Sequence, residues 1–212
     1  IERFKYSLLL NNYSLLVNMI PKNTSKIVRF LLRNIEKSGY NINQIARAAK
    51  TSVGSAFKIL KTMEKNKVVT AEAMGNALYY TLNFDNLEAV KLCELLLIEE
   101  KRDLRGYAKL YAESLQNFDR SDVIVLFGSI LMKKEFNDVD VLFLTDRVEE
   151  VNKFCLELAK VRAKPVVPLI LKKKDFIQEL KNKNEVILSI VKNGVIIKGE
   201  SLFLEAIKNA KK

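Results

Sequence analysis

The sequence predicts a mixed α/β (α+β) protein in which two domains are joined by a helical connector. Hydrophobic residues make up 49% of the 212 residues, with only seven Gly and three Pro, so the chain can form a substantial core. Apolar residues at helical spacing precede a hairpin pattern within 21–85, and hydrophobic strands separated by a short loop begin the segment 120–212. We therefore expect an extension at 1–20, a domain at 21–85, a connector at 86–119 and a second domain at 120–212.

The residue types that the chain lacks exclude several kinds of site. It contains no His, which excludes Ser-His-Asp triads and His-ligated zinc. Its two Cys, Cys93 and Cys155, lie in apolar helical patterns; we expect reduced core thiols in a cytoplasmic protein, with one disulfide as the alternative. The apolar segment Leu8–Ile20 is interrupted by three Asn and is shorter than the roughly 20 residues that span a bilayer, so no membrane association is expected.

Two helices are expected at the start of the first domain. Apolar residues recur at helical spacing from 27 to 35, and Thr24 or Ser25 can cap this first helix, which would end at Ser38-Gly39. A shorter helix is expected from Asn43. A turn at residues 50–52 separates it from the next helical pattern.

The third helix is predicted from Val53 to Lys65, and a hairpin follows it. The helix is expected to bury one apolar stripe, formed by Val53, Ala56, Phe57, Leu60 and Met63. Strands are expected at 68–71 and 77–82, with a turn at Met74-Gly75-Asn76 between them. Helix, helix, turn, helix and hairpin is the order of a winged helix-turn-helix.

The outward face of this third helix predicts binding to double-stranded DNA. Small hydroxyl side chains near its start and lysines further along suit a helix that inserts in the major groove. Residues 1–85 contain 13 basic and five acidic residues, a net charge of +8, which favours a polyanionic partner. The expected DNA-binding residues are Arg47, Lys50, Ser52, Ser55, Lys58, Thr62 and Lys65. The alternatives are a winged helix used for protein contacts, or basic residues that only keep the surface soluble.

The first domain resembles archaeal and bacterial winged-helix regulators. Their recognition helix opens with a Ser-x-Gly-(Ser/Thr)-(Val/Ala) run, which here reads Ser52-Val53-Gly54-Ser55-Ala56. The resemblance covers about 60 residues and implies a DNA-binding transcription regulator. The predicted wing departs from a basic one, because Met74-Gly75-Asn76-Ala77 has no Arg or Lys to enter the minor groove.

The predicted connector, 86–119, is either one long helix or two consecutive helices with a break near Gly106. Val90, Leu97, Leu104 and Tyr111 recur every seven residues. One interpretation is a homodimerisation helix, since winged-helix proteins often bind two half-sites as dimers. The other is a connector that packs on its own two domains. The pattern leaves both open.

Two aspartates in the second domain carry the most informative pattern. A buried strand, Val123–Phe127, is followed by Gly128-Ser129, and Asp138-Val139-Asp140 opens the next strand. Residues i and i+2 of a strand share a face, so Asp138 and Asp140 should project side by side, where they repel unless a proton or cation lies between them. Mg²⁺ commonly binds one or two carboxylates together with substrate phosphates. We expect these aspartates to bind Mg²⁺ and to be the catalytic residues.

The loop between the two strands suits a nucleotide. Gly128 allows a phosphate to approach the backbone, and Ser129 can donate to a phosphate oxygen at the start of the next helix. Lys133 is the third expected nucleotide-binding residue, with a solvated loop residue as the alternative. The chemistry that these groups suit is nucleotidyl transfer, in which metal ions bind an NTP and stabilise displacement at its α-phosphate.

The second domain resembles the nucleotidyltransferase fold of the polymerase-β superfamily, particularly its minimal members. The family signature is a hydrophobic strand, Gly-Ser, a spacer and Asp-x-Asp on the next strand, and here it reads Leu126-Phe127-Gly128-Ser129 followed by Asp138-Val139-Asp140. The resemblance extends over about 120–205 and implies a nucleotidyltransferase-like α/β domain with a mixed sheet. Active members place a third carboxylate on a later strand, but the corresponding strand, Pro165–Leu171, has no acidic residue.

Together the patterns predict a DNA-binding winged-helix regulator whose second domain binds Mg²⁺ and a nucleotide, with weak or lost catalysis. The alternative is an active nucleotidyltransferase that transfers a nucleotide from an NTP to a protein, RNA or small-molecule acceptor. A third hypothesis makes both domains interaction modules that contact a protein partner in a larger assembly.

Overall fold

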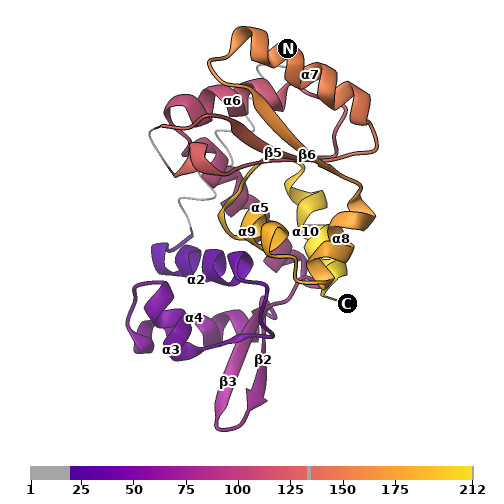
Figure 1. The fold of residues 1–212 in the computed structure, drawn as a ribbon. Helices are drawn as coiled ribbons and strands as arrows, with labels where there is room; N and C mark the ends of the chain where they lie inside the picture. The colour runs from indigo at the N-terminus through magenta and orange to yellow at the C-terminus, as the bar shows by residue number, and fades with distance from the viewer. Residues whose placement is uncertain (1–19, 133–134, 212) are drawn as a thin grey trace, which may run out of the picture. The chain divides into compact units, whose positions relative to one another are not determined.

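The computed structural model describes residues 20–132 and 135–211. These residues form a mixed α/β structure with nine α-helices, one short 3-10 helix and two sheets, one of them mixed (Figure 1). The chain divides into two compact units, Ile1–Glu99 and Glu100–Lys212. The division falls within the segment that the sequence suggested as a connector.

The first unit combines the helices α2, α3 and α4 with a three-stranded antiparallel sheet, and it also contains most of the later helix α5 (Leu87–Arg102). Its strand order is β1-β3-β2, so the β2–β3 hairpin pairs with the short strand that precedes the second helix. In chain order the elements are α2 (Lys22–Arg33), β1 (Tyr40–Asn41), α3 (Ile42–Ala48), α4 (Val53–Lys65), β2 (Val69–Met74) and β3 (Ala77–Leu82).

The boundaries of α2 differ from the prediction at both ends. It begins at Lys22, and the Ser25 N–H already donates to the Pro21 carbonyl (3.0 Å), so the predicted caps are wrong. It ends at Arg33 rather than at the predicted Ser-Gly pair, and the Asn34 side chain donates to a carbonyl of its last turn. Local hydrogen bonds at each end decide these limits. The next helix, α3, starts within one residue of its predicted position, and a capping box satisfies its N-terminus.

The predicted limits of α4 are confirmed, but the predicted burial of its apolar stripe is wrong at two positions. Ala56, Leu60 and Met63 are buried, whereas the side chains of Val53 and Phe57 are 47% and 48% exposed. At 3.6 residues per turn, Val53 and Phe57 are rotated by roughly 50° and 90° from the centre of the buried line. They therefore lie at the edge of the packed face, where the neighbouring helices no longer cover them.

The segment 86–119 contains two helices rather than one. In chain order they are α5 (Leu87–Arg102) and α6 (Gly106–Gln116). Gly106, where we expected a break, is the first residue of α6 and has a φ of +55°. Tyr111 is fully buried in the core of the second unit, so this position of the seven-residue repeat is not available to a partner helix.

The second unit is built on a four-stranded sheet with the order β6-β5-β4-β7. β5 and β6 are parallel and are connected through α7, while β4 is antiparallel to both of its neighbours. After α6 the elements are β4 (Val123–Phe127), the 3-10 helix η1 (Ser129–Leu131), β5 (Val139–Leu144), α7 (Val148–Val161), β6 (Val166–Leu171), α8 (Lys173–Lys181), α9 (Glu185–Asn193), β7 (Val195–Lys198) and α10 (Glu200–Ala210).

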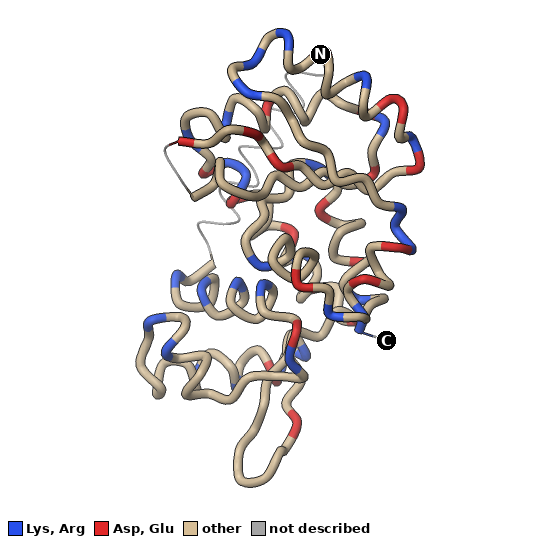
Figure 2. The backbone as a smooth tube through the Cα atoms, in the orientation of Figure 1, with Lys and Arg blue, Asp and Glu red and all other residues tan. Residues whose placement is uncertain are grey.

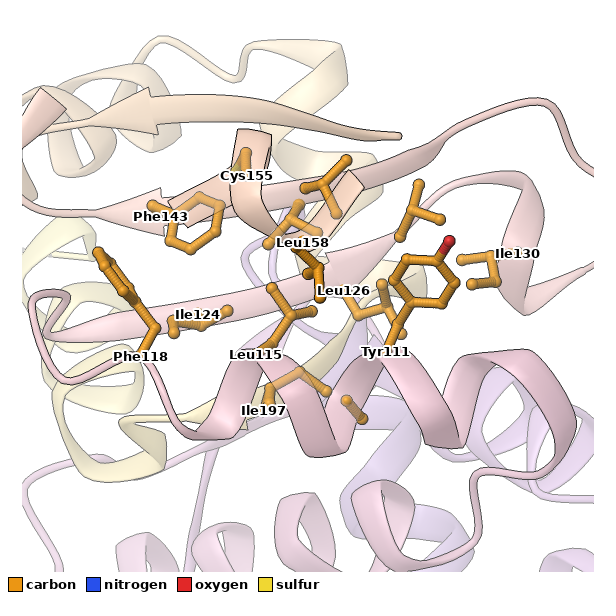
Figure 3. Close-up of a cluster of buried hydrophobic side chains, with 14 of the residues drawn as sticks. Tyr111, Leu115, Phe118, Ile124, Leu126, Ile130, Phe143, Cys155, Leu158 and Ile197 are labelled. Carbon is orange, nitrogen blue, oxygen red and sulfur yellow. The ribbon is translucent and has the colours of Figure 1, made fainter. Parts of the chain in front are cut away.

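Both faces of this sheet are covered by helices, which produces a three-layer unit. On one face, alternate residues of β4 and β5 pack against α6 and α7, and Figure 3 shows the labelled side chains of this cluster converging between the sheet and the helices. The Tyr111 hydroxyl, at the edge of that core, donates to the Lys164 carbonyl (2.6 Å) and accepts from its N–H (2.9 Å). It thereby holds the chain immediately before β6. On the other side of the sheet from α7 lie α8, α9 and α10 (Figure 1).

Two further findings bear on the sequence predictions. Among residues 20–132 and 135–211, no helix has both the length and the apolar character needed to cross a membrane. Cys93 and Cys155 are buried, free thiols. Burial raises the pKa of the Cys93 thiol to about 12 and that of Cys155 to about 11, so neither forms the reactive thiolate at neutral pH.

Candidate functional site

Asp138 and Asp140 lie at the end of the central strands of the second unit, although not as the sequence suggested. β5 begins at Val139, so Asp140 is on the strand and Asp138 immediately precedes it. Val139 is fully buried in the core, and strand alternation turns Asp140 to the opposite face. Both carboxyl groups belong to half-buried residues. The cross-strand neighbours of Asp140 are Phe127 on β4 and Val167 on β6.

Gly128 is in direct contact with Asp140. It follows the last residue of β4 and has a φ of +81° and a ψ of −156°. Residues that carry a Cβ rarely adopt this backbone conformation. A Cβ added at this position would overlap Asp140 Oδ2 and lie 2.9 Å from its Cγ. The absence of a side chain at Gly128 is therefore what allows the carboxylate to lie against the backbone.

Of the other two predicted nucleotide-binding residues, Ser129 is placed less favourably for contact with a phosphate. Ser129 is half-buried and begins the expected helix, but this is a 3-10 helix of only three residues. A single turn lacks the aligned peptide dipoles that favour phosphate at the start of a longer helix. Lys133 lies outside the described residues.

The electrostatic environment of the two aspartates favours binding of a cation. Partial burial of the carboxyl raises the pKa of Asp140, and the negative charge of Asp138 raises that pKa further. A second carboxylate that disfavours ionisation of the first must be close to it. Either a proton on one carboxyl or a bound cation would relieve the repulsion between them.

The donor set fits a Mg²⁺ ion that shares its ligands with a phosphate. Within the described ranges, the structure contains no group of three or more His, Cys, Asp or Glu side chains that could hold a metal by themselves. Asp138 and Asp140 supply two carboxylates, and Mg²⁺ usually binds one or two together with water and substrate phosphates. The parallel register places Val167, not an acidic residue, beside Asp140. The side chain of Val167 is 47% exposed, so the position is open but apolar.

Replacing Asp140 by Asn is expected to raise the melting temperature of the protein without nucleotide at neutral pH. Because the pKa of Asp140 is raised in the folded protein, the folded state holds a proton at pH values at which the unfolded chain, with a pKa of about 3.9, has lost it. Wild-type stability from this group is therefore greatest in acid and falls as the pH rises through the folded pKa. Asn does not ionise and escapes that loss.

The measurement compares the melting temperatures of wild type and Asp140→Asn from pH about 4 to about 7, without Mg²⁺ or nucleotide. The advantage of the variant should grow with pH and then remain constant. A constant difference across the whole range would contradict a raised pKa at Asp140.

In the first unit, the predicted DNA-binding residues of the turn and of the start of α4 lie close together in the sequence, around the N-terminus of that helix. Arg47 and Lys50 are exposed at the end of α3 and in the following turn. Ser52 caps α4, because its Oγ accepts the Ser55 N–H (3.1 Å). Ser52 is exposed and Ser55 half-buried, so both hydroxyls remain accessible in part.

Three lysines lie in a line along the exposed part of α4, and the sequence pattern identified only two of them. Lys58 and Lys65 are exposed as predicted, and Lys61, which was missed, lies between them. The spacing i, i+3, i+7 places the three side chains on one face of the helix, and that periodicity was the signal that could have identified Lys61. Thr62 is also exposed, but its Oγ1 donates to the Lys58 carbonyl (3.0 Å). Figure 2 shows Lys and Arg recurring along α2, α3 and α4.

The β2–β3 hairpin, which the sequence predicted as a wing, carries apolar side chains and no Lys or Arg. The β2–β3 hairpin closes through Gly75 and Asn76, since Met74 pairs with Ala77. Met74 and Leu78 are 38% and 47% exposed. This hairpin therefore offers no positive charge to a DNA minor groove, and α4 provides the cationic surface instead.

The chain matches no protein-family model, and no curated protein matches it. The function of each unit has to be inferred from its own residues.

Proposed function

We propose that the protein is a DNA-binding winged-helix regulator whose second unit binds a nucleotide together with Mg²⁺ and transfers it weakly or not at all. The observation that carries DNA binding is the exposed lysine line of α4, Lys58, Lys61 and Lys65. The helix has no acidic residue in its first turn. A cationic helix of this kind, in a unit with a net positive charge, is complementary to the phosphates that border a major groove.

Nucleotide binding is supported by the contact between Gly128 and the Asp140 carboxylate, with Asp138 beside it. Asp138 and Asp140 would hold Mg²⁺, and the phosphates of the nucleotide would complete the ligands of the ion. A bound Mg²⁺ ion supplies charge neutralisation for the phosphates of the nucleotide. The residues of the chain bind the nucleotide and orient it. They do not complete a catalytic metal site, because neither aspartate has a third carboxylate as a neighbour on β6.

Weak or absent transfer follows from the residue at the position beside Asp140. Val167 is its parallel neighbour, and a valine can neither bind a metal nor accept a proton from an incoming hydroxyl group. An active nucleotidyltransferase is the second candidate. The observation that favours it is the Asp138–Asp140 pair, whose mutual repulsion is of the kind found at catalytic metal sites.

Affinity for duplex DNA is expected to fall steeply as salt rises from about 50 mM to about 200 mM, because phosphate contacts release bound counterions. Lys58→Ala and Lys65→Ala should each weaken binding to all sequences to a similar extent and reduce the slope of log K against log salt by about 1. A change at Ser55 should instead alter sequence preference, since base contacts specify and phosphate contacts position.

The measurement is fluorescence anisotropy with the full chain and a pool of duplexes. Lys153→Ala is the matched control, because Lys153 is an exposed lysine of α7 in the other unit. The proposal fails if the wild type binds no duplex, or if its affinity is independent of salt. Equal effects of Lys153→Ala and Lys58→Ala would also contradict it, because they would assign binding to overall charge.

A further inference from the structure

Phe57 is exposed at the edge of the packed face of α4, beside Lys61, although a phenylalanine at this helical spacing would ordinarily be buried. Its side chain is 48% exposed, and Val53, one turn earlier, is 47% exposed. Leaving about half of such a ring in water forgoes part of the free energy that full burial would provide. Neither residue is required by the core of the unit, which α4 enters through Ala56, Leu60 and Met63.

Lys61 lies next to the exposed ring. Its Nζ is 5.8 Å from the centroid of the Phe57 ring, within the distance at which a cation and an aromatic face attract each other. The helix therefore presents an ammonium donor directly beside an apolar surface. This combination of one strong donor and one adjacent apolar patch is a specific chemical pattern.

The major-groove edge of thymine presents the complementary pattern. Thymine carries the O4 acceptor and the C5-methyl group side by side, whereas cytosine has an N4 donor, adenine an N6 donor and guanine two acceptors without a methyl group. We infer that Phe57 and Lys61 read a thymine, with the Phe57 ring against the C5-methyl group and the Lys61 Nζ donating to O4. This inference rests on the proposed DNA binding and identifies which base the helix selects.

The surroundings of the pair favour a base edge over an apolar protein surface. The cores of protein–protein interfaces are depleted of lysine, whereas Phe57 and Val53 are accompanied by Lys58 and Lys61 on the same helix. The segment 1–85 carries a net charge of +8, and DNA is the partner whose apolar methyl groups lie between rows of phosphates. Glu64 is the single acidic residue of α4, and it lies near the end of the helix, two turns beyond Phe57.

The test uses the full chain and separates the two contacts by base analogues. A preferred duplex is first selected from a random pool, and each thymine is then replaced in turn by deoxyuridine, which lacks the methyl group, or by 5-methylcytosine paired with guanine, which keeps the methyl group but replaces O4 by a donor. For one thymine, deoxyuridine is expected to weaken wild-type binding about fourfold to tenfold, the effect of burying one methyl group. 5-Methylcytosine should weaken it at least as much.

The variants assign each effect to a side chain. Phe57→Ala should bind the thymine and deoxyuridine duplexes equally, Phe57→Leu should retain part of the difference, and Lys61→Ala should keep that difference while losing discrimination against 5-methylcytosine. The melting temperatures of the three variants show whether each one is folded. If the wild type binds duplexes but no thymine is sensitive to removal of its methyl group, or if Phe57→Ala keeps the full difference, the inference is wrong while DNA binding stands. Absence of any duplex binding would overturn the proposed function itself.

Discussion

Replacing either Asp138 or Asp140 by Asn is expected to abolish the Mg²⁺-dependent part of nucleotide binding. The two carboxylates are the protein ligands of the proposed ion. The neighbour of Asp140 on β6 is Val167, so no third carboxylate on that strand compensates for the loss of one. Removing a charge from a metal site costs several kcal/mol, which corresponds to about two orders of magnitude in affinity or more. Titration of ATP, GTP, CTP and UTP with and without Mg²⁺, followed by thermal shift, measures the change.

Asp122→Asn is the matched control for this experiment. Asp122 is an exposed aspartate just before β4, at the end of that strand remote from Gly128. The control should retain the full Mg²⁺-dependent shift. Retained Mg²⁺-dependent binding in the double variant Asp138→Asn/Asp140→Asn would show that the pair has a structural role and that the site is assigned wrongly.

A labelling assay separates a nucleotide-binding unit from an active transferase. With an NTP labelled at the α-phosphate, the wild type is expected to bind nucleotide but to label an acceptor weakly or not at all. Val167→Asp places a carboxylate beside Asp140 and should increase labelling, whereas Leu169→Asp, whose neighbour on β5 is Leu142, should not. Efficient labelling by the wild type, lost in Asp140→Asn, would instead favour the active nucleotidyltransferase.

Replacing Gly128 by Ala is expected to destabilise the protein and to remove nucleotide binding together. The new Cβ would overlap Asp140 Oδ2, so either the carboxylate or the backbone at the end of β4 must move. Overpacking of this kind typically costs about 1–3 kcal/mol, in addition to about 1–3 kcal/mol for a side chain in a backbone region that is essentially restricted to glycine. Urea unfolding of the full chain measures the first effect, and the nucleotide titration measures the second.

Gly106→Ala is the control for a side chain at positive φ without the clash. Gly106 has a φ of +55°, and no described heavy atom lies within 4 Å of a Cβ built there. Its replacement should cost only the positive-φ penalty and should leave nucleotide binding unchanged. In an Asp140→Ala background, which removes the carboxyl group, Gly128→Ala should cost clearly less than in the wild type. Equal destabilisation by Gly128→Ala in both backgrounds would contradict the contact as the cause.

The sequence by itself determined those elements whose signals are local. The limits of α4, and the strand Val123–Phe127, follow from side-chain periodicity and from flanking residues such as Ser52, which caps α4 through its own hydroxyl. The pattern Gly-Ser followed by Asp-x-Asp likewise singled out Gly128 and Asp140, which are in contact in the structure. Such features depend on residues a few positions apart along the chain, so they can be deduced without knowledge of the tertiary structure.

The tertiary structure decided what depends on register and on coverage by distant elements. The antiparallel pairing of Phe127 with Asp140 brings Gly128 against the carboxylate, and the parallel pairing of β5 with β6 makes Val167 its other neighbour. Neither pairing can be read from spacing, because a shift of one residue would turn every side chain to the other face. Phe57 was misjudged for a related reason. Periodicity shows that a residue is near the apolar side of a helix, but only the positions of the neighbouring helices show where that side stops being covered.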